Sequence, residues 1–378
     1  MNFGLNEEQR ILRDSAHGFL AKECPGTFVR EMVEDEKGYT SGLWQKMAEL
    51  GWMGILFPEQ YGGYEGSFLD LAVLLYEMGY VCLPGPYFST VVHGAITLLE
   101  AGSDTQKSEI LPKVASGEEI LTLAWTETGG SYAAQEISLK AELQNDRYVL
   151  TGTKLFVPDA HVAGKIICVA RTREPEGDYE EGVSLFIVDG ENPGLTVHVH
   201  STLAGDKQCE VEFDQVEVPA ENLLGELHMG WPVLKKVLQK ASVAKCAQMI
   251  GGGQRAIDLA VPYLKEREQF GRPVGSFQAV KHHCANILTL LETSKFMTFQ
   301  AAWRISEGLS FEKEASMCKA WVSDSYRQLV ALAHQVMGGI GFMEEHDLQL
   351  YFKQAKTSEL AFGDARFHRE LVAQQMGL

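Results

Sequence analysis

Residues 209–214 read CEVEFD, so that apolar and acidic side chains alternate from one position to the next. A period of two is typical of a β-strand with one face buried and the other in water. Residues 195–200, LTVHVH, repeat the alternation. Apolar runs predict further strands at 148–150, 166–170 and 183–188. From about residue 119 to residue 225 we therefore expect a largely antiparallel sheet.

Helical periodicity lies on both sides of this region. Asn6 and Gln9 form a candidate capping box, and it precedes an apolar helical face made of Leu12, Ala16, Phe19 and Leu20. Other helices are expected at 68–79, 91–101, 276–305, 311–337 and 346–373. Helices, strands and helices in separate runs predict an α+β chain. Its three expected domains are residues 1–118, 119–225 and 226–378.

Composition narrows the possible functions. The chain has 378 residues, of which 45% are hydrophobic and 22% charged, as is typical of a globular protein. A net charge of −18 disfavours binding to nucleic acid or to an anionic membrane surface. The seven cysteines are scattered and include no CxxC pair, which argues against a disulfide framework or a zinc site. Reduced thiols and an N-terminus without an apolar signal segment favour a cytoplasmic location.

Two segments of the strand region are candidates for chemistry. Residues 123–131, LAWTETGGS, end in a glycine-rich turn whose amides can hold a phosphate, and Trp125 can pack on an aromatic ring. Residues 148–160, YVLTGTKLFVPDA, are a strand and a turn in which Phe156 is expected in the core. Taken alone, each segment is better explained as an ordinary strand running into a turn.

Two further segments lie in the C-terminal helical region. Residues 267–273 read REQFGRP, and Arg267 carries a fork of donors suited to a pyrophosphate. A salt bridge near a helix end explains Arg267 better when the segment is taken alone. Residues 335–342, QVMGGIGF, place three glycines within four residues, which breaks a helix and lets a ligand approach the backbone. No strand precedes these glycines, so they are not a dinucleotide-binding fingerprint.

Taken together and in this order, the segments resemble the acyl-CoA dehydrogenase family of flavoproteins along nearly the whole chain. The matches are residues 61–63 to the YGG loop, 123–131 to TEPxxGS, 152–154 to GxKxWIT, 211–225 to FDDVxVPxxxLLG, 267–271 to RxQFG and 335–341 to QxxGGxG. The resemblance implies an N-terminal helical domain, a middle antiparallel β-barrel and a C-terminal four-helix bundle. It also implies FAD, a homo- or hetero-tetramer built from dimers, and α,β-dehydrogenation of an acyl-CoA thioester with electrons passed to an electron-transferring flavoprotein.

The same resemblance assigns binding roles. The residues expected to contact FAD are Trp125, Thr126, Ser131, Phe156, Val157, Arg267, Phe270, Phe277, Gln278, Gln335, Gly338, Gly339 and Arg366. Ser131 and Gly252 are expected to contact the substrate. Residues 251–253 are three glycines within a helix, which either widen the pocket or allow close helix packing. A widened pocket would favour a branched, cyclic or dicarboxylic acyl-CoA over a straight chain.

The chain departs from the family where the catalytic base is expected. That base is a Glu at one of two positions, which here hold Phe362 and Ala241. Asp364, two residues beyond Phe362, is one candidate for the base. The alternatives are a non-catalytic, FAD-sharing subunit of a heteromeric dehydrogenase, or changed chemistry such as that of an oxidase or a desulfinase. Pro158 replaces a flavin-contacting Thr and has no N–H, which predicts weaker retention of FAD.

Overall fold

The computed structural model describes residues 4–130 and 132–378. Its packing divides the chain into two compact units. The first contains Met1–Glu31, Ser67–Leu83 and Ser242–Leu378, and the second contains Met32–Gly66 and Pro84–Ala241. Within the described residues, none of the helices combines the length and the apolar character that spanning a bilayer requires. The division into three domains stays a prediction.

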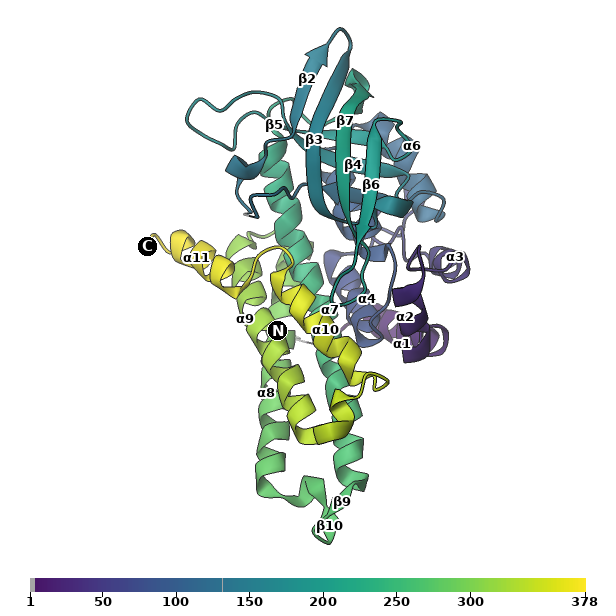
Figure 1. The fold of residues 1–378 in the computed structure, drawn as a ribbon, viewed down its shortest axis with the longest axis vertical. Coiled ribbons are helices and arrows are strands. Elements are labelled where there is room, and N and C mark those ends of the chain that lie inside the picture. The colour runs from purple at the N-terminus through teal and green to yellow at the C-terminus, as the bar shows by residue number, and fades with distance from the viewer. Residues whose placement is uncertain (1–3, 131) are drawn as a thin grey trace. The chain divides into compact units, whose positions relative to one another are not determined.

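The first unit is built from helices. They are α1 (Glu7–Glu23), the start of α2 (Gly26–Glu34), α4 (Phe68–Tyr80), the larger part of α7 (Gly230–Glu266), α8 (Gln278–Ser306), α9 (Glu312–Met337), α10 (Leu348–Leu360) and α11 (Ala365–Gln375). Figure 1 shows α8, α9 and α10 lying side by side. The hairpin of β9 (Glu268–Gln269) and β10 (Arg272–Pro273) and the 3-10 turn η6 (Val274–Ser276) lie between α7 and α8. The 3-10 turn η7 (Gly338–Phe342) lies between α9 and α10.

Local sequence explains how α1 begins. The Asn6 side chain accepts the Gln9 amide at 2.7 Å, and the Gln9 side chain accepts the Asn6 amide at 3.1 Å. Two backbone donors that the helix itself leaves unpaired are satisfied in this way. The predicted capping box is therefore confirmed.

The end of the first unit differs from the prediction. The prediction of a single helix over residues 346–373 is wrong, because the helix is interrupted between α10 and α11. Gly363 has a φ angle of +102°, a conformation that glycine adopts without the steric cost of a Cβ. Asp364 follows as the N-cap of α11. Glycine and cap together end one helix and start the next.

The second unit contains the predicted sheet. Its strands are β1 (Leu121–Ala124), β2 (Lys140–Gln144), β3 (Arg147–Pro158), β4 (Lys165–Arg171), β5 (Val183–Asp189), β6 (Leu195–His200), β7 (Gln208–Pro219) and β8 (Leu223–Leu224). They pair in the order β6-β7-β3-β2-β4-β5-β8, and β1 pairs with β4. Most pairs are antiparallel as expected, whereas β1–β4 and β2–β4 are parallel. β3, β7 and β6 are seen side by side in Figure 1.

Burial in β7 follows the alternation of its sequence. Cys209, Val211 and Phe213 are buried, whereas Glu212 and Asp214 are exposed. Because successive strand side chains point to opposite faces, this is the expected outcome for a strand with one wet face. In β4 and β5 both faces are buried, which explains their continuous apolar runs.

Helices also contribute to the second unit. They are α3 (Ser41–Glu49), η1 (Glu59–Tyr61), the π-helical η2 (Phe88–Ala95), α5 (Ile96–Ala101), α6 (Asp104–Ala115), η3 (Ala134–Glu136), η4 (Ala160–Val162) and η5 (Ala220–Asn222). The sequence analysis did not predict α6. Ser103 and Gln106 form a capping box at its start, and this was the signal that could have revealed it.

Candidate functional site

A buried ion pair joins the two motif segments of the second unit. The Lys154 ammonium lies 2.6 Å from a Glu127 carboxylate oxygen, and both side chains are buried. The carboxylate also accepts the backbone amides of Ser138 at 3.0 Å and Leu139 at 3.1 Å. Burial acts to raise the pKa of Glu127, but Lys154, the Ser138 hydroxyl and the Leu139 amide bring its pKa below the ordinary value. The charged carboxylate therefore fastens the 123–131 segment to β3.

Three aromatic residues, Trp125, Tyr132 and Phe156, lie within a few positions of Glu127 or Lys154 in the sequence. Trp125 is buried, and its ring centre lies 5.7 Å from that of Tyr132. Phe156 is 60% exposed, so its expected place in the core is wrong. The register of β3 against β7 shifts between Lys154 and Val157, and Phe156 takes a φ angle of +52° there. This local shift turns the Phe156 ring outward while Val157 stays buried.

A left-handed Phe backbone is energetically costly. For an L-residue other than glycine, the left-handed conformation raises the free energy by roughly 1–2 kcal/mol. Strain of this kind is retained where the surrounding structure imposes it, and it is concentrated at functional sites. The register shift therefore lowers the stability of the fold but exposes an aromatic ring on the surface of the second unit.

The glycine-rich turn continues from Trp125. Thr126 is half-buried, and its carbonyl accepts the Leu155 amide of β3 at 2.9 Å. Gly130 has a φ angle of +68°, and a Cβ placed there would meet no atom within 4 Å. Ser131 lies outside the described residues. The turn therefore leaves open space beside its backbone, which suits the close approach of a ligand.

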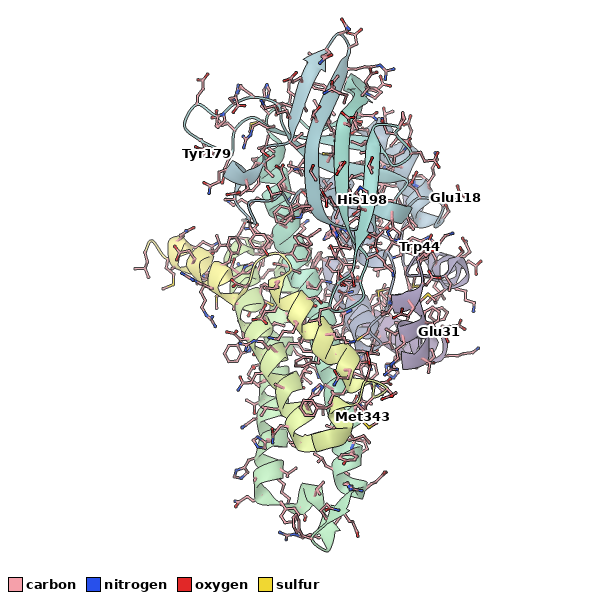
Figure 2. All side chains as sticks on the ribbon, viewed as in Figure 1. Glu31, Trp44, Glu118, Tyr179, His198 and Met343 are labelled. Atoms are coloured by element: carbon pink, nitrogen blue, oxygen red, sulfur yellow. The ribbon has the colours of Figure 1, made fainter. Side chains whose placement is uncertain are left out.

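Arg171 organises the chain beside this turn, and the sequence analysis missed it. Its buried guanidinium donates to the carbonyl oxygens of Ala134, Ile137, Tyr179 and Glu181, at distances of 2.7–3.1 Å. Figure 2 shows Tyr179 on the loop that joins β4 to β5. One guanidinium therefore ties this loop to the segment that follows the glycine-rich turn.

In the first unit, several predicted FAD residues line one cavity of about 410 Å³. Arg267, Phe270 and Phe277 come from the hairpin region between α7 and α8, and Val336 and Met337 come from the end of α9. The lining combines one cation with apolar and aromatic side chains. A guanidinium beside flat apolar walls is suited to a nucleotide with its phosphates.

The hairpin itself is unusually exposed. Phe270 has a φ angle of +54° and is 91% exposed. The Arg272 guanidinium lies 4.0 Å from the centre of the Phe277 ring, within the range of a cation–π contact. Gln278, which begins α8, is exposed as well.

The glycines after α9 leave their backbone accessible. Gly338 has a φ angle of +64°, and a Cβ placed on Gly338 or Gly339 would meet no atom within 4 Å. Gln335 and Arg366 are also exposed. These predicted FAD residues are therefore open to a ligand, and their contacts with FAD stay predictions.

Asp364 has a clear local role in the structure. Its carboxylate oxygen Oδ1 accepts the Phe367 amide at 2.8 Å, so that Asp364 is the N-cap of α11. Phe362, immediately before, has a φ angle of +61°. Its carbonyl lies 2.9 Å from Nε2 of the buried His368. The cap explains this carboxylate structurally, and a role as catalytic base stays a prediction.

The glycines of α7 are placed at close helix contacts. A Cβ on Gly251 would lie 1.9 Å from the Tyr76 carbonyl oxygen of α4. A Cβ on Gly252 would lie 2.3 Å from the Tyr326 hydroxyl of α9. At Gly251 the obstructing atoms are backbone, so only glycine fits, and at Gly252 the Tyr326 ring would have to shift to admit a Cβ. Close packing therefore accounts for these two glycines, and a substrate contact by Gly252 stays a prediction.

Comparisons with known proteins agree with this architecture. The N-terminal, middle and C-terminal domain models of acyl-CoA dehydrogenase match residues 6–118, 122–216 and 228–377. The probable acyl-CoA dehydrogenase YngJ of Bacillus subtilis is 32% identical over 381 residues, covering 100% of both chains. Acryloyl-CoA reductase (NADH) of Anaerotignum propionicum is 31% identical, covering 100% of this chain and 96% of the relative.

A solved structure gives the same result. Butyryl-CoA dehydrogenase from Megasphaera elsdenii superposes with a TM-score of 0.93 at 27% identity, covering 100% of both chains. The matching helices and strands span both compact units. The chain therefore belongs to the acyl-CoA dehydrogenase family, an oxidoreductase family with FAD as its cofactor.

The described residues fit this cofactor. The exposed ring of Phe156 offers a flat apolar surface to an aromatic ring system, whereas Trp125 is buried behind its segment. Arg267 lines a cavity large enough for part of a nucleotide, and the backbone at Gly338 is open. Pro158 is the exception, because it has no N–H to donate.

Proposed function

We propose that the protein catalyses α,β-dehydrogenation of an acyl-CoA thioester and passes the electrons to an electron-transferring flavoprotein. The observation that carries the proposal is the outward-turned ring of Phe156, which the β3 register shift holds at a position expected to contact FAD. The proposed acyl group is branched, cyclic or dicarboxylic. Close packing explains Gly251 and Gly252 without a widened pocket. Straight-chain acyl-CoAs therefore also have to be tried as substrates.

FAD supplies the acceptor for the two electrons that leave the acyl group. In the proposed mechanism, the rings of Trp125 and Phe156 pack against the flavin and exclude water from it. Arg267 pairs with the pyrophosphate through charge-assisted hydrogen bonds. The Glu127–Lys154 ion pair holds the 123–131 segment in place on β3.

The base that removes the α-proton is the open step. Phe362 and Ala241 carry no acid, and Asp364 already accepts the Phe367 amide. One candidate is that Asp364 also removes the proton. The cap hydrogen bond favours a second candidate, in which this chain shares FAD with a partner subunit that supplies the Glu. An oxidase or desulfinase activity is the third.

An anaerobic titration of the purified chain with straight, branched, cyclic and dicarboxylic acyl-CoAs tests the proposal. Bleaching of the flavin absorbance by one class would support a complete dehydrogenase and identify its substrate. A bound flavin that no thioester bleaches would contradict it and favour the heteromeric subunit. Peroxide formed in air without an electron-transferring partner would favour an oxidase.

Asp364→Asn separates the two candidates for the base. Asn caps a helix about as well as Asp does, so the substitution removes the carboxylate while keeping the Phe367 hydrogen bond. Loss of bleaching with unchanged stability would identify Asp364 as the base. Full activity of the variant chain alone would exclude it.

The oligomeric state and the location of the protein also belong to this proposal. We propose a tetramer built from dimers, either homomeric or heteromeric, in the cytoplasm. Light scattering of the purified chain, alone and after co-expression with a related chain that carries the Glu, would distinguish the two kinds of tetramer.

A further inference from the structure

The turn between α10 and α11 has an unusual backbone. Phe362 and Gly363 have φ angles of +61° and +102°. The left-handed region suits glycine and is an outlier for a bulky residue such as Phe. Such a conformation persists only where the surrounding structure imposes it, and it is concentrated at functional sites. The groups that hold the turn are therefore informative about its role.

Lys319 of α9 holds both ends of this turn. Its side chain is fully buried, and Nζ donates to the carbonyl oxygens of Glu359 at 3.0 Å and Gly363 at 2.9 Å. The third hydrogen bond goes to the Ser323 hydroxyl at 2.9 Å. An ammonium has three donors, so these acceptors use all of them.

The choice of a lysine here is informative. These three acceptors are two carbonyls and one hydroxyl rather than a carboxylate, and burying a charge in this way is unfavourable. Burial lowers the pKa of Lys319 to about 8. An apolar side chain would fill the same space without that penalty. Unlike an apolar side chain, the ammonium fixes the positions of the Glu359 and Gly363 carbonyls.

His368 of α11 holds the middle of the turn. Its Nε2 lies 2.9 Å from the Phe362 carbonyl oxygen. Because a carbonyl only accepts, Nε2 carries the proton. Nδ1 is buried and has no hydrogen-bond partner within the described part of the chain. Burial first, and then the Lys319 charge, lower the pKa of His368 to about 4, so the ring is neutral near pH 7.

We infer that Lys319 is a positioning residue, which together with His368 holds the 360–364 turn so that the side chain of residue 362 is presented to the acyl group. This inference rests on the proposed function, because the family resemblance puts the base that removes the α-proton at position 362, and such a base lies beside the acyl group. The presented side chain is an aromatic ring. Phe362 is therefore the residue that selects the acyl group, and its flat apolar face suits a ring-containing or unsaturated chain.

Alkylation of a thiol at position 362 tests how the turn is held. Phe362→Cys is treated with iodoacetamide in the FAD-loaded protein, and the modified peptides are followed by mass spectrometry. Adding Lys319→Met or His368→Leu is expected to raise the reaction rate of the introduced thiol by about tenfold, because the turn opens locally. His368→Gln keeps an N–H donor and is expected to restore the parent rate to within about twofold.

Ser316→Ala is the matched control. Ser316 lies on α9 with Lys319, and its buried hydroxyl has no hydrogen-bond partner among the described residues. Its removal changes the same helix without touching the turn. The thiol introduced at position 362 is expected to react at the parent rate in this background.

Substrate binding supplies a second readout in the chain that retains Phe362. The Kd for acyl-CoAs is measured from the change that they produce in the flavin absorbance. Lys319→Met is expected to weaken binding by about tenfold. Phe362→Leu is expected to abolish the preference for a ring-containing over a straight acyl group while leaving the turn in place.

The inference is overturned if folded Lys319→Met protein leaves the introduced thiol reacting at the parent rate. Should Lys319→Met fail to fold, the comparison of His368→Leu with His368→Gln gives the same decision. Alkylation needs no acyl-CoA, so failure of the proposed function and failure of the role of Lys319 can be told apart. A wild-type flavin that responds to no thioester contradicts the proposed function, whereas unchanged alkylation contradicts the role of Lys319.

Discussion

The ammonium of Lys154 and the carboxylate of Glu127 lie 2.6 Å apart with both side chains buried. Lys154 belongs to β3, and Glu127 lies between β1 and the glycine-rich turn. The pair therefore connects two stretches of chain that both carry residues expected to contact FAD. Breaking the ion pair should therefore displace the residues that are expected to contact FAD.

Lys154→Met is expected to lower the free energy of unfolding by about 3–5 kcal/mol, because it leaves Glu127 buried without its counter-charge. Urea denaturation measures the change. Lys165→Met is the control, since Lys165 pairs at 2.7 Å with the more exposed Asp189 and should contribute about 0–1 kcal/mol. Equal effects of the two substitutions would contradict the prediction.

The same pair predicts a dependence on pH. The pKa of Glu127 is lowered in the folded protein, so its contribution to stability is present above the unfolded value of about 4.3. It is lost as the pH falls through the folded value. In Lys154→Met this acid-induced loss should shrink, which urea denaturation at a series of pH values can measure.

His368 predicts a loss of stability at higher pH values than Glu127 does. Its folded pKa of about 4 lies below the ordinary value of about 6.5. Between these values the unfolded chain binds a proton that the folded chain does not, so stability falls as the pH drops from about 6.5 to about 4. The full difference corresponds to roughly 3 kcal/mol. His368→Gln should flatten this part of the stability curve.

The exposed His282 is the control for that measurement. His282→Gln leaves His368 in place, so the fall in stability that is assigned to His368 should persist in this variant. The charged groups that act on His368 are Lys319 and Asp364, and both remain in place in His368→Gln. If the free energy of unfolding of His368→Gln still fell between about pH 6.5 and pH 4 as in the wild type, the assignment of this fall to His368 would be wrong.

Gly251→Ala is expected to destabilise the protein by about 1–3 kcal/mol, because its Cβ would meet the Tyr76 carbonyl oxygen at 1.9 Å. Gly18→Ala is the matched control on α1, where a Cβ would meet no atom within 4 Å. There the change should stabilise by roughly 0.5–1 kcal/mol through helix propensity. Thermal unfolding would reveal the opposite signs, and two shifts of the same sign would refute the packing argument.

Arg267→Met is expected to weaken FAD binding about ten- to a hundredfold, the magnitude of a lost hydrogen bond to a charged group. Lys265→Met removes the same charge close by, at an exposed position outside the lining of the cavity. It should leave FAD binding within about twofold of wild type. Titration of the apoprotein with FAD, followed by flavin fluorescence, compares the two. Equal affinities would show that Arg267 does not hold the cofactor.

Features that depend on a few neighbouring residues could be predicted from the sequence. The alternation over residues 209–214 predicted a strand, and β7 buries Val211 and Phe213 while Glu212 stays exposed. The Asn6–Gln9 capping box is likewise contained within four residues. In such cases the spacing along the chain already determines which side chains share a face and which backbone groups need a partner.

Features that depend on distant residues could not be predicted in this way. Phe156 looked like a core residue, yet a register shift against β7 turns it outward. The glycines at 251 and 252 were equally consistent with a wide pocket, and only the positions of Tyr76 and Tyr326 decide for close packing.

The sequence by itself determined the order of helices and strands and the motifs of the family, because these depend on local periodicity and composition. The tertiary structure decided the conformation of residues 360–364. Periodicity predicted a helix there, but Lys319, more than 40 residues earlier in the chain, binds the carbonyls of Glu359 and Gly363. Which carbonyls a buried ammonium reaches depends on how α9 packs against α10 and α11, and local sequence carries no record of that packing.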